Sequence, residues 1–394
     1  MLSTYTQIPI SFTGVIALVL SLALALGLAR DGLTRAYYVG LLVLHLIGTV
    51  IFYALTIRSP ADAHVYYAKS EWVRDFDVGT QFISFLLGWV REFTDLTMLD
   101  AFLVFQIPGL LGIIFLHRTA VRFAAEQFDT RVVLLAVILM MPGLHLWTSS
   151  IGKDSLAIFA FGLIAMAMVQ KEIHLGLLAA GLIVYFCVRP HIAFELALAM
   201  SLAFLPIFGY ATKRTQFVGI GTAILFLAML PFIFLFVGID GNGSEGVQNY
   251  VENRQNRAFR GGSSFSLGAL NPVERILTVM FRPLFFDASG VLGLVASIEN
   301  LFLITVFAYL AWNTGVILRL MSRSAMLRFN VFFVLIFMAV FSQTTGNLGL
   351  ALRQKMMLIP ALFLILTAVI AYHNRRRQDR RAALKSSLDP IEQL

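Results

Sequence analysis

A lysine and an aspartate stand side by side, Lys153-Asp154, in a short polar stretch between two apolar runs. The stretch reads Trp147-Thr148-Ser149-Ser150-Ile151-Gly152-Lys153-Asp154-Ser155. Ionisable groups are costly at the edge of a bilayer, so those that are kept there are candidates for a functional site. The alternative is an interfacial ion pair in which Asp154 or Ser155 serves as the N-cap of the next helix.

Other basic side chains occur in equally short polar turns between apolar runs. They are Arg189, His191, Arg282, Arg353 and Lys355. Guanidinium and ammonium groups form strong bonds with phosphate or carboxylate groups, so we interpret these residues as candidates for binding an anionic substrate. For Arg189 the alternative is that it complements the dipole at the C-terminal end of a helix.

Two longer polar segments add further candidates. In the first, Asp62, His64 and Tyr66 emerge just beyond an apolar run, where the carboxylate is placed to act as a base or to bind sugar hydroxyls. Asp62 as an ordinary solvated acid is the alternative. In the second, Arg254 and Arg257 share one face if the segment is helical, a pattern that suits a phosphate or carboxylate ligand. Anionic lipid headgroups or plain solvent are the alternatives there.

The elements that must position these residues are transmembrane helices. Of the 394 residues, 59% are hydrophobic and only 13% are charged, which excludes an ordinary soluble domain. Apolar runs of spanning length predict an all-α polytopic membrane protein, a single transmembrane domain over 1–394 with about eleven spans. The predicted spans are 8–28, 36–57, 98–116, 132–147, 155–170, 173–189, 191–209, 216–238, 291–312, 329–345 and 356–372.

The distribution of basic residues predicts the orientation of these spans. More than half of the 30 lysines and arginines fall in loops on one side, which the positive-inside rule makes cytoplasmic. The N-terminus is then outside and the C-terminus inside, with a basic cytoplasmic tail at 373–394. Two long loops, 58–97 with an interfacial helix at 79–90 and 239–290, lie on the extracytoplasmic face. Lys153, Arg189 and Arg353 fall on that face too, against the usual preference, which marks them as candidates for function.

Composition also restricts cofactors and partners. The seven histidines are dispersed, Cys187 is the single cysteine, and no ligand spacing predicts a metal site. We expect no cofactor. The net charge of +8 is explained by cytoplasmic loops and anionic membrane lipids, so no nucleic-acid partner is expected.

Short motifs scattered along the chain resemble those of bacterial polysaccharide polymerases of the Wzy and EpsG type and of related GT-C-type glycosyltransferases. The motifs are Asp62-Ala63-His64-Val65-Tyr66-Tyr67, the stretch from Trp147 to Asp154, Phe281-Arg282-Pro283, and Gly346-Asn347-Leu348-Gly349-Leu350-Ala351-Leu352-Arg353-Gln354-Lys355 followed by Pro360. The resemblance implies a GT-C-like helical bundle in the bacterial inner membrane that uses polyprenyl-linked sugars at the outer face. Asp62 matches the carboxylate of the GT-C enzymes, although their usual acidic pair is absent. Arg353, Arg282 and Arg189 match the outer-face arginines of the polymerases.

We therefore expect a metal-independent glycosyltransferase or polymerase acting on a polyprenyl-(pyro)phosphate-linked saccharide. Asp62 or Asp154 would take the proton of the acceptor hydroxyl, and Arg353 would stabilise the leaving group. Two alternatives stay open. One is a transporter or flippase of lipid-linked saccharides, and the other is a non-catalytic subunit that works with other polysaccharide assembly proteins.

Overall fold

The computed structural model describes residues 10–59, 61–127, 137–170, 172–205, 213–237 and 270–388. Over these residues the protein is 83% helical and contains no strand. The elements in chain order are α1 (Phe12–Gly27), α2 (Gly32–Thr56), α3 (Asp62–Lys69), α4 (Thr80–Phe93), α5 (Met98–Gln127), α6 (Pro142–Thr148), α7 (Lys153–Met168), α8 (Leu175–Val188), α9 (Pro190–Ala203), α10 (Lys213–Val237), α12 (Pro272–Phe281), α13 (Gly290–Trp312), α14 (Thr314–Met321), α15 (Ala325–Thr344), α16 (Leu348–Gln354), the 3-10 segment η5 (Lys355–Leu358) and α17 (Ile359–Leu388).

The chain is an all-helical membrane protein, as its composition predicts. Six helices of the described part are long and apolar enough to cross a bilayer, and a bent pair, α6 with α7, makes a seventh candidate. Large apolar side chains such as Val19, Val50, Ile224 and Ile298 are exposed on the outer helices, where lipid would cover them. The predicted total of eleven spans is not confirmed. Helices α8 and α9 have 14 residues each, a length of about 21 Å against a hydrocarbon core of about 30 Å.

One predicted span differs clearly from the structure. The stretch 132–147 is described from residue 137 onward, and there it consists of a short 3-10 turn followed by α6. Helix α6 has only seven residues, a length of about 10 Å. Pro142 begins it, because a residue without an N–H group is well placed in the first turn of a helix but not in its interior. In its described part, Ile138, Leu139 and Leu144 are buried inside the protein.

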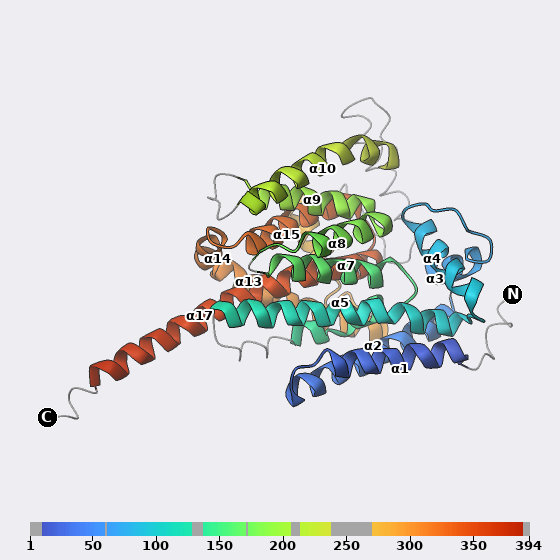
Figure 1. The fold of residues 1–394 in the computed structure, drawn as a ribbon, viewed down its shortest axis with the longest axis horizontal. Coiled ribbons are helices and arrows are strands. Elements are labelled where there is room, and N and C mark those ends of the chain that lie inside the picture. Colours follow the sequence, from blue (N-terminus) through green and yellow to red (C-terminus); the bar gives the residue numbers. More distant parts are fainter. Residues whose placement is uncertain are drawn as a thin grey trace.

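Glycines allow the central helices to pack closely. A side chain at Gly112 of α5 would meet the backbone of Ile158 in α7 at 2.5 Å, and one at Gly162 of α7 would meet the Gly112 carbonyl oxygen at 2.9 Å. Small residues at such crossings are typical of helix packing in membranes. The long helices run roughly side by side, with α10 along one side of the bundle and α1 and α2 along the other (Figure 1).

The two ends of the bundle carry different elements. Helices α3 and α4, from the predicted loop 58–97, lie at one end, while α17 projects beyond the bundle at the other (Figure 1). The predicted tail at 373–394 is helical as far as it is described, since α17 continues unbroken to Leu388. Arg375 and Arg376 on this extension line a pocket together with Arg319 of α14 and Arg323 of the turn after it, so basic residues gather at this part of α17.

The predicted loop at 239–290 is described only from residue 270. Its described part contains α12, which begins with a capping box formed by Asn271 and Glu274. Arg254 and Arg257 lie outside the described residues.

Candidate functional site

The polar stretch identified in the sequence forms the bend between α6 and α7. The two helices meet at an angle of 108°, and Lys153 and Asp154 are the first two residues of α7. The N-cap is Gly152, which has no side chain to bond, so the alternative in which Asp154 or Ser155 caps the helix is wrong. The Ser155 hydroxyl instead donates to the Gly152 carbonyl oxygen at 3.1 Å.

Asp154 is a buried carboxylate held between two arginines. Its side chain is only 5% exposed. Arg189 Nη2 lies 2.5 Å from Oδ1, and Arg353 Nε lies 2.6 Å from Oδ2. Arg189 comes from the junction of α8 and α9 and Arg353 from α16, so this single residue ties three distant parts of the chain together. A carboxylate bonded in this way cannot readily accept a further proton, because both of its oxygens already accept charge-assisted hydrogen bonds.

Arg353 links this buried pair to the surface. Its Nη1 donates to Asp62 Oδ2 at 2.8 Å, and the Asp62 side chain, at the start of α3, is 61% exposed. The Arg353 guanidinium also lies 5.6 Å from the centre of the Trp147 ring, within the range of a cation–π contact. The arginine therefore has an acid on each side and an aromatic ring beside it.

Lys153 is a neighbouring cation that has no partner among the residues that the structure describes. It lies within electrostatic range of Arg189, Arg353, Asp62 and Asp154, yet it forms no ion pair or hydrogen bond with any described residue. We refer to these five residues, Asp62, Lys153, Asp154, Arg189 and Arg353, as the Asp154 cluster. Three cations against two carboxylates leave it with a net charge of +1.

Tyr66 of α3 lies against the cluster. A side chain at Gly152 would contact both the Tyr66 ring, at 3.9 Å, and Arg353 Nη2, at 3.6 Å. Burial, together with the charge of the nearby Asp62 carboxylate, raises the pKa of Tyr66 to about 12. The phenol is thus a neutral hydrogen-bond donor at the edge of the site.

Two of the predicted substrate-binding residues lie in a separate polar cluster. Lys355 is 1% exposed, and its Nζ donates to the carbonyl oxygens of Met280, at 3.3 Å, and Arg282, at 3.4 Å, and to Asn300 Oδ1. Arg282 pairs with Asp287, with 2.5 Å between Nε and Oδ2. These bonds fasten the segment after α12 to α13 and η5, so the visible role of Lys355 is structural.

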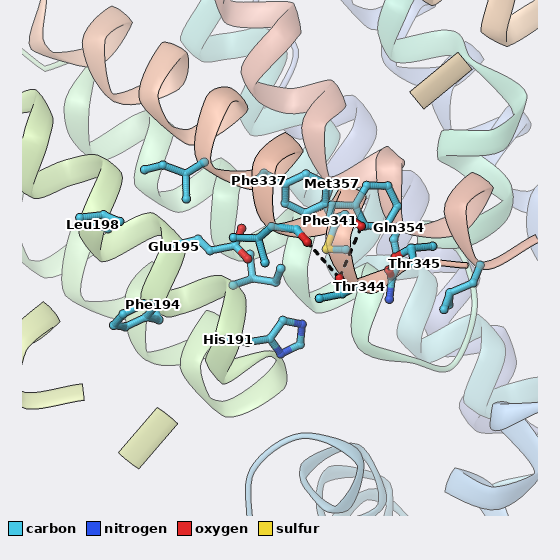
Figure 2. A pocket seen from close by; sticks show the side chains of 14 residues that line it. His191, Phe194, Glu195, Leu198, Phe337, Phe341, Thr344, Thr345, Gln354 and Met357 are labelled. Carbon is cyan, nitrogen blue, oxygen red and sulfur yellow. Dashed lines mark hydrogen bonds between the residues drawn. The ribbon is translucent and has the colours of Figure 1, made fainter. Parts of the chain in front are cut away.

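The predicted histidines are placed apart from each other. His64 is on α3, two residues after the Asp62 that bonds Arg353, and is partly buried. His191 is on α9 and lines a cavity of about 220 Å³ between α9, α15 and α16. Figure 2 shows this cavity, with His191 and Glu195 on one wall, Phe337 and Phe341 across from them, and Thr345 and Gln354 at one end.

Glu195 and Glu299 are two buried acids that the sequence reasoning missed. Glu195 is 4% exposed, and its Oε2 has no hydrogen-bond partner in the described part of the chain. Glu299 is buried on α13 and accepts a hydrogen bond from the Gly143 N–H at 2.5 Å. A signal was available, because both carboxylates interrupt predicted spans, 191–209 and 291–312, and acids inside spans are rare.

Comparisons with known proteins do not assign the chain to a family. No family model, no curated protein and no solved structure matches the chain. Among the described residues, no group of three or more histidine, cysteine, aspartate or glutamate side chains is placed to hold a metal ion. Function is therefore inferred from the residues of the site.

Proposed function

We propose that the protein is a membrane glycosyltransferase of the polymerase type that takes its sugar from a polyprenyl-(pyro)phosphate donor. The proposal agrees with the resemblance to the Wzy and EpsG polymerases and to GT-C-type enzymes. The observation that carries it is Lys153, a cation without a partner among the described residues, beside the ion pairs of Asp154. Such a site suits an anionic group that arrives with a lipid.

Electrostatics favours a phosphate at this position. Lys153 is partly buried and stands near two guanidinium groups, and like charges in a poorly solvated place repel each other unless an anion joins them. The buried Nε of Arg189 also lacks an acceptor. A phosphate oxygen supplies both the negative charge and the missing acceptor, since phosphates form strong charge-assisted bonds with such groups.

The different contacts of the two candidate carboxylates support different roles for them in this proposal. Asp154 uses both oxygens to hold Arg189 and Arg353, so we assign it a positioning role. Asp62 is largely exposed and bonds Arg353 through one oxygen, which leaves it the better proton acceptor. In the proposed step, the acceptor hydroxyl oxygen attacks the anomeric carbon of the donor sugar and passes its proton to Asp62. The bond from that carbon to the phosphate oxygen breaks, and the phosphate keeps the electron pair while Lys153 and Arg353 stabilise its charge.

The proposal also assigns an orientation. The Asp154 cluster includes Asp62 of α3, and α3 lies at the end of the bundle away from the α17 extension (Figure 1). The arginines that gather around α17 mark the cytoplasmic side by the positive-inside rule. The site then faces the extracytoplasmic side of a bacterial inner membrane, where lipid-linked saccharides are polymerised.

The decisive experiment uses purified protein in detergent with a lipid-linked oligosaccharide. Mass spectrometry should detect elongated saccharide–lipid products, and Lys153→Gln should reduce their rate of formation by about 10- to 100-fold, the loss expected for one charge-assisted hydrogen bond. Lys213→Gln, at an exposed lysine that begins α10, is the matched control and should retain wild-type activity. Wild-type product lengths and rates in Lys153→Gln would contradict the proposal.

The same preparation distinguishes the alternatives. If no glycosidic bond forms but the reconstituted protein moves lipid-linked saccharide across vesicles, the protein is a flippase. If neither activity is found and the saccharide–lipid is not bound, the chain is a non-catalytic assembly subunit. Both outcomes refute the transferase proposal.

A further inference from the structure

We propose that the cavity between α9, α15 and α16 is a second binding site, one that takes an organic ammonium group carried on a small apolar body. The site is separate from the Asp154 cluster and does not depend on the proposed function. Its central residue is Glu195, whose side chain extends from α9 into the cavity (Figure 2).

The first reason is an uncompensated acid. Glu195 is almost fully buried, its Oε2 has no hydrogen-bond partner, and no cation of the described chain forms an ion pair with it. A buried carboxylate is expensive unless it is protonated or paired. A proton is one way to neutralise such a group. A ligand that brings a positive charge can replace that proton and gain an ion pair in a medium where such pairs are strong.

The second reason is the nature of the walls. Three phenylalanine rings line the cavity, from Phe194 of α9 and from Phe337 and Phe341 of α15. The faces of aromatic rings attract ammonium groups, and more strongly where water is excluded. Among the described lining residues there is no lysine or arginine, and His191 is the one basic side chain.

The third reason is the set of polar groups at the end near α16. The hydroxyls of Thr344 and Thr345 and the amide of Gln354 can all accept hydrogen bonds, and the Thr345 hydroxyl lies 3.4 Å from Gln354 Oε1. Acceptors beside a carboxylate suit a ligand with several N–H donors, as a primary ammonium has. A purely hydrocarbon ligand, such as an isoprenoid chain, would bury the carboxylate without satisfying it.

The size of the cavity limits the ligand. A volume of about 220 Å³ lies below that of typical drug-sized pockets. It suits a small molecule such as an arylalkylamine. We therefore use 2-phenylethylamine as the probe, with 2-phenylethanol as its neutral analogue and phenylacetate as its anionic analogue.

The test is calorimetric titration of the full-length protein in detergent with the three probes. The amine should bind at least about tenfold more tightly than the alcohol, the gain expected for a hydrogen-bonded charge pair, and phenylacetate should bind most weakly. Glu195→Gln preserves the shape and removes the charge, so it should reduce the preference for amine over alcohol to about twofold or less and leave alcohol binding unchanged. Glu172→Gln, at an exposed glutamate, is the matched control and should behave as wild type.

A second variant keeps the proposal falsifiable if Glu195→Gln does not fold. Leu350 lines the cavity and is only partly buried, so Leu350→Trp should fill the space and weaken the amine and the alcohol alike, by about tenfold or more. The proposal is overturned if wild-type protein binds no probe, if it binds phenylacetate or the alcohol as tightly as the amine, or if the preference for the amine survives in Glu195→Gln.

Discussion

The bond between Asp154 and Arg353 is expected to be a main contributor to the stability of the site, and a double-mutant cycle can measure its coupling energy. Asp154→Asn removes the carboxylate that bonds both Arg189 and Arg353. Removing one partner of a buried ion pair costs about 3–5 kcal/mol, because the remaining charge is left without compensation. Arg353→Gln should cost about 3 kcal/mol, near the lower end of that range, since Asp154 keeps its bond to Arg189.

The same arginine provides its own control. Arg353 bonds Asp154, which is 5% exposed, and Asp62, which is 61% exposed. Exposed pairs contribute about 0.2–1 kcal/mol, because water and salt screen them. We therefore expect a coupling energy of about 2–3 kcal/mol for Asp154 with Arg353 and of at most about 1 kcal/mol for Asp62 with Arg353.

The assay is reversible unfolding of the detergent-solubilised protein, followed by circular dichroism. It needs the single variants Asp154→Asn, Asp62→Asn and Arg353→Gln and the two double variants that contain Arg353→Gln. The coupling energy is the part of the change in unfolding free energy that the single variants do not account for. Equal coupling energies for the two acids would refute the reasoning, because burial would then make no difference to the pair.

Two further predictions concern packing and ionisation. Gly112→Ala should lower the melting temperature clearly, because its methyl group would meet the backbone of Ile158 at 2.5 Å, whereas Gly40→Ala, with nothing within 4 Å, should leave it unchanged or slightly higher. An unchanged or higher melting temperature in both variants would show that helix propensity, and not the α5–α7 contact, decides. In an ultraviolet titration against Tyr66→Phe, Tyr66 should ionise near pH 12, because burial and the Asp62 charge raise its pKa from the ordinary value of 10. The pKa of Tyr66 is higher in the folded than in the unfolded protein, so the stability that this phenol contributes is complete below about pH 10 and is lost as the pH rises towards 12. Ionisation of Tyr66 near pH 10 in the folded protein would contradict this prediction.

Composition alone determined the class of the protein. A chain with 59% hydrophobic and 13% charged residues can satisfy its backbone in lipid only as helices or closed barrels, and long apolar runs without strand-like alternation indicated helices. The structure confirms an all-helical membrane protein. The number of spans could not be obtained in the same way, because an apolar run looks the same whether lipid or protein surrounds it. The short helix α6, together with α8 and α9, is an example.

Residue type and position also identified five charged residues as unusual, because placing a charge at a membrane edge costs free energy. They are Lys153, Asp154, Arg189, Arg353 and Asp62. Which of these residues pair with each other could not be predicted from the sequence. Lys153 and Asp154 are neighbours in the chain, yet Asp154 bonds arginines 35 and 199 positions away. Lys355, two residues after Arg353, lies in a different cluster, because the chain turns from α16 into η5 between them.

The sequence by itself thus determined which charged side chains are candidates for a function. The free-energy cost of placing a charge near lipid depends on the residue type and on its apolar surroundings, and both can be read from the sequence. Only the tertiary structure decided which of these charged side chains form ion pairs and which have no partner among the described residues. That outcome depends on distances of 2.5–2.8 Å between atoms of separate helices, and these distances are fixed by how the helices pack. Within the described part of the chain, Lys153 without a partner and Glu195 Oε2 without a hydrogen-bond donor became visible only in that packing.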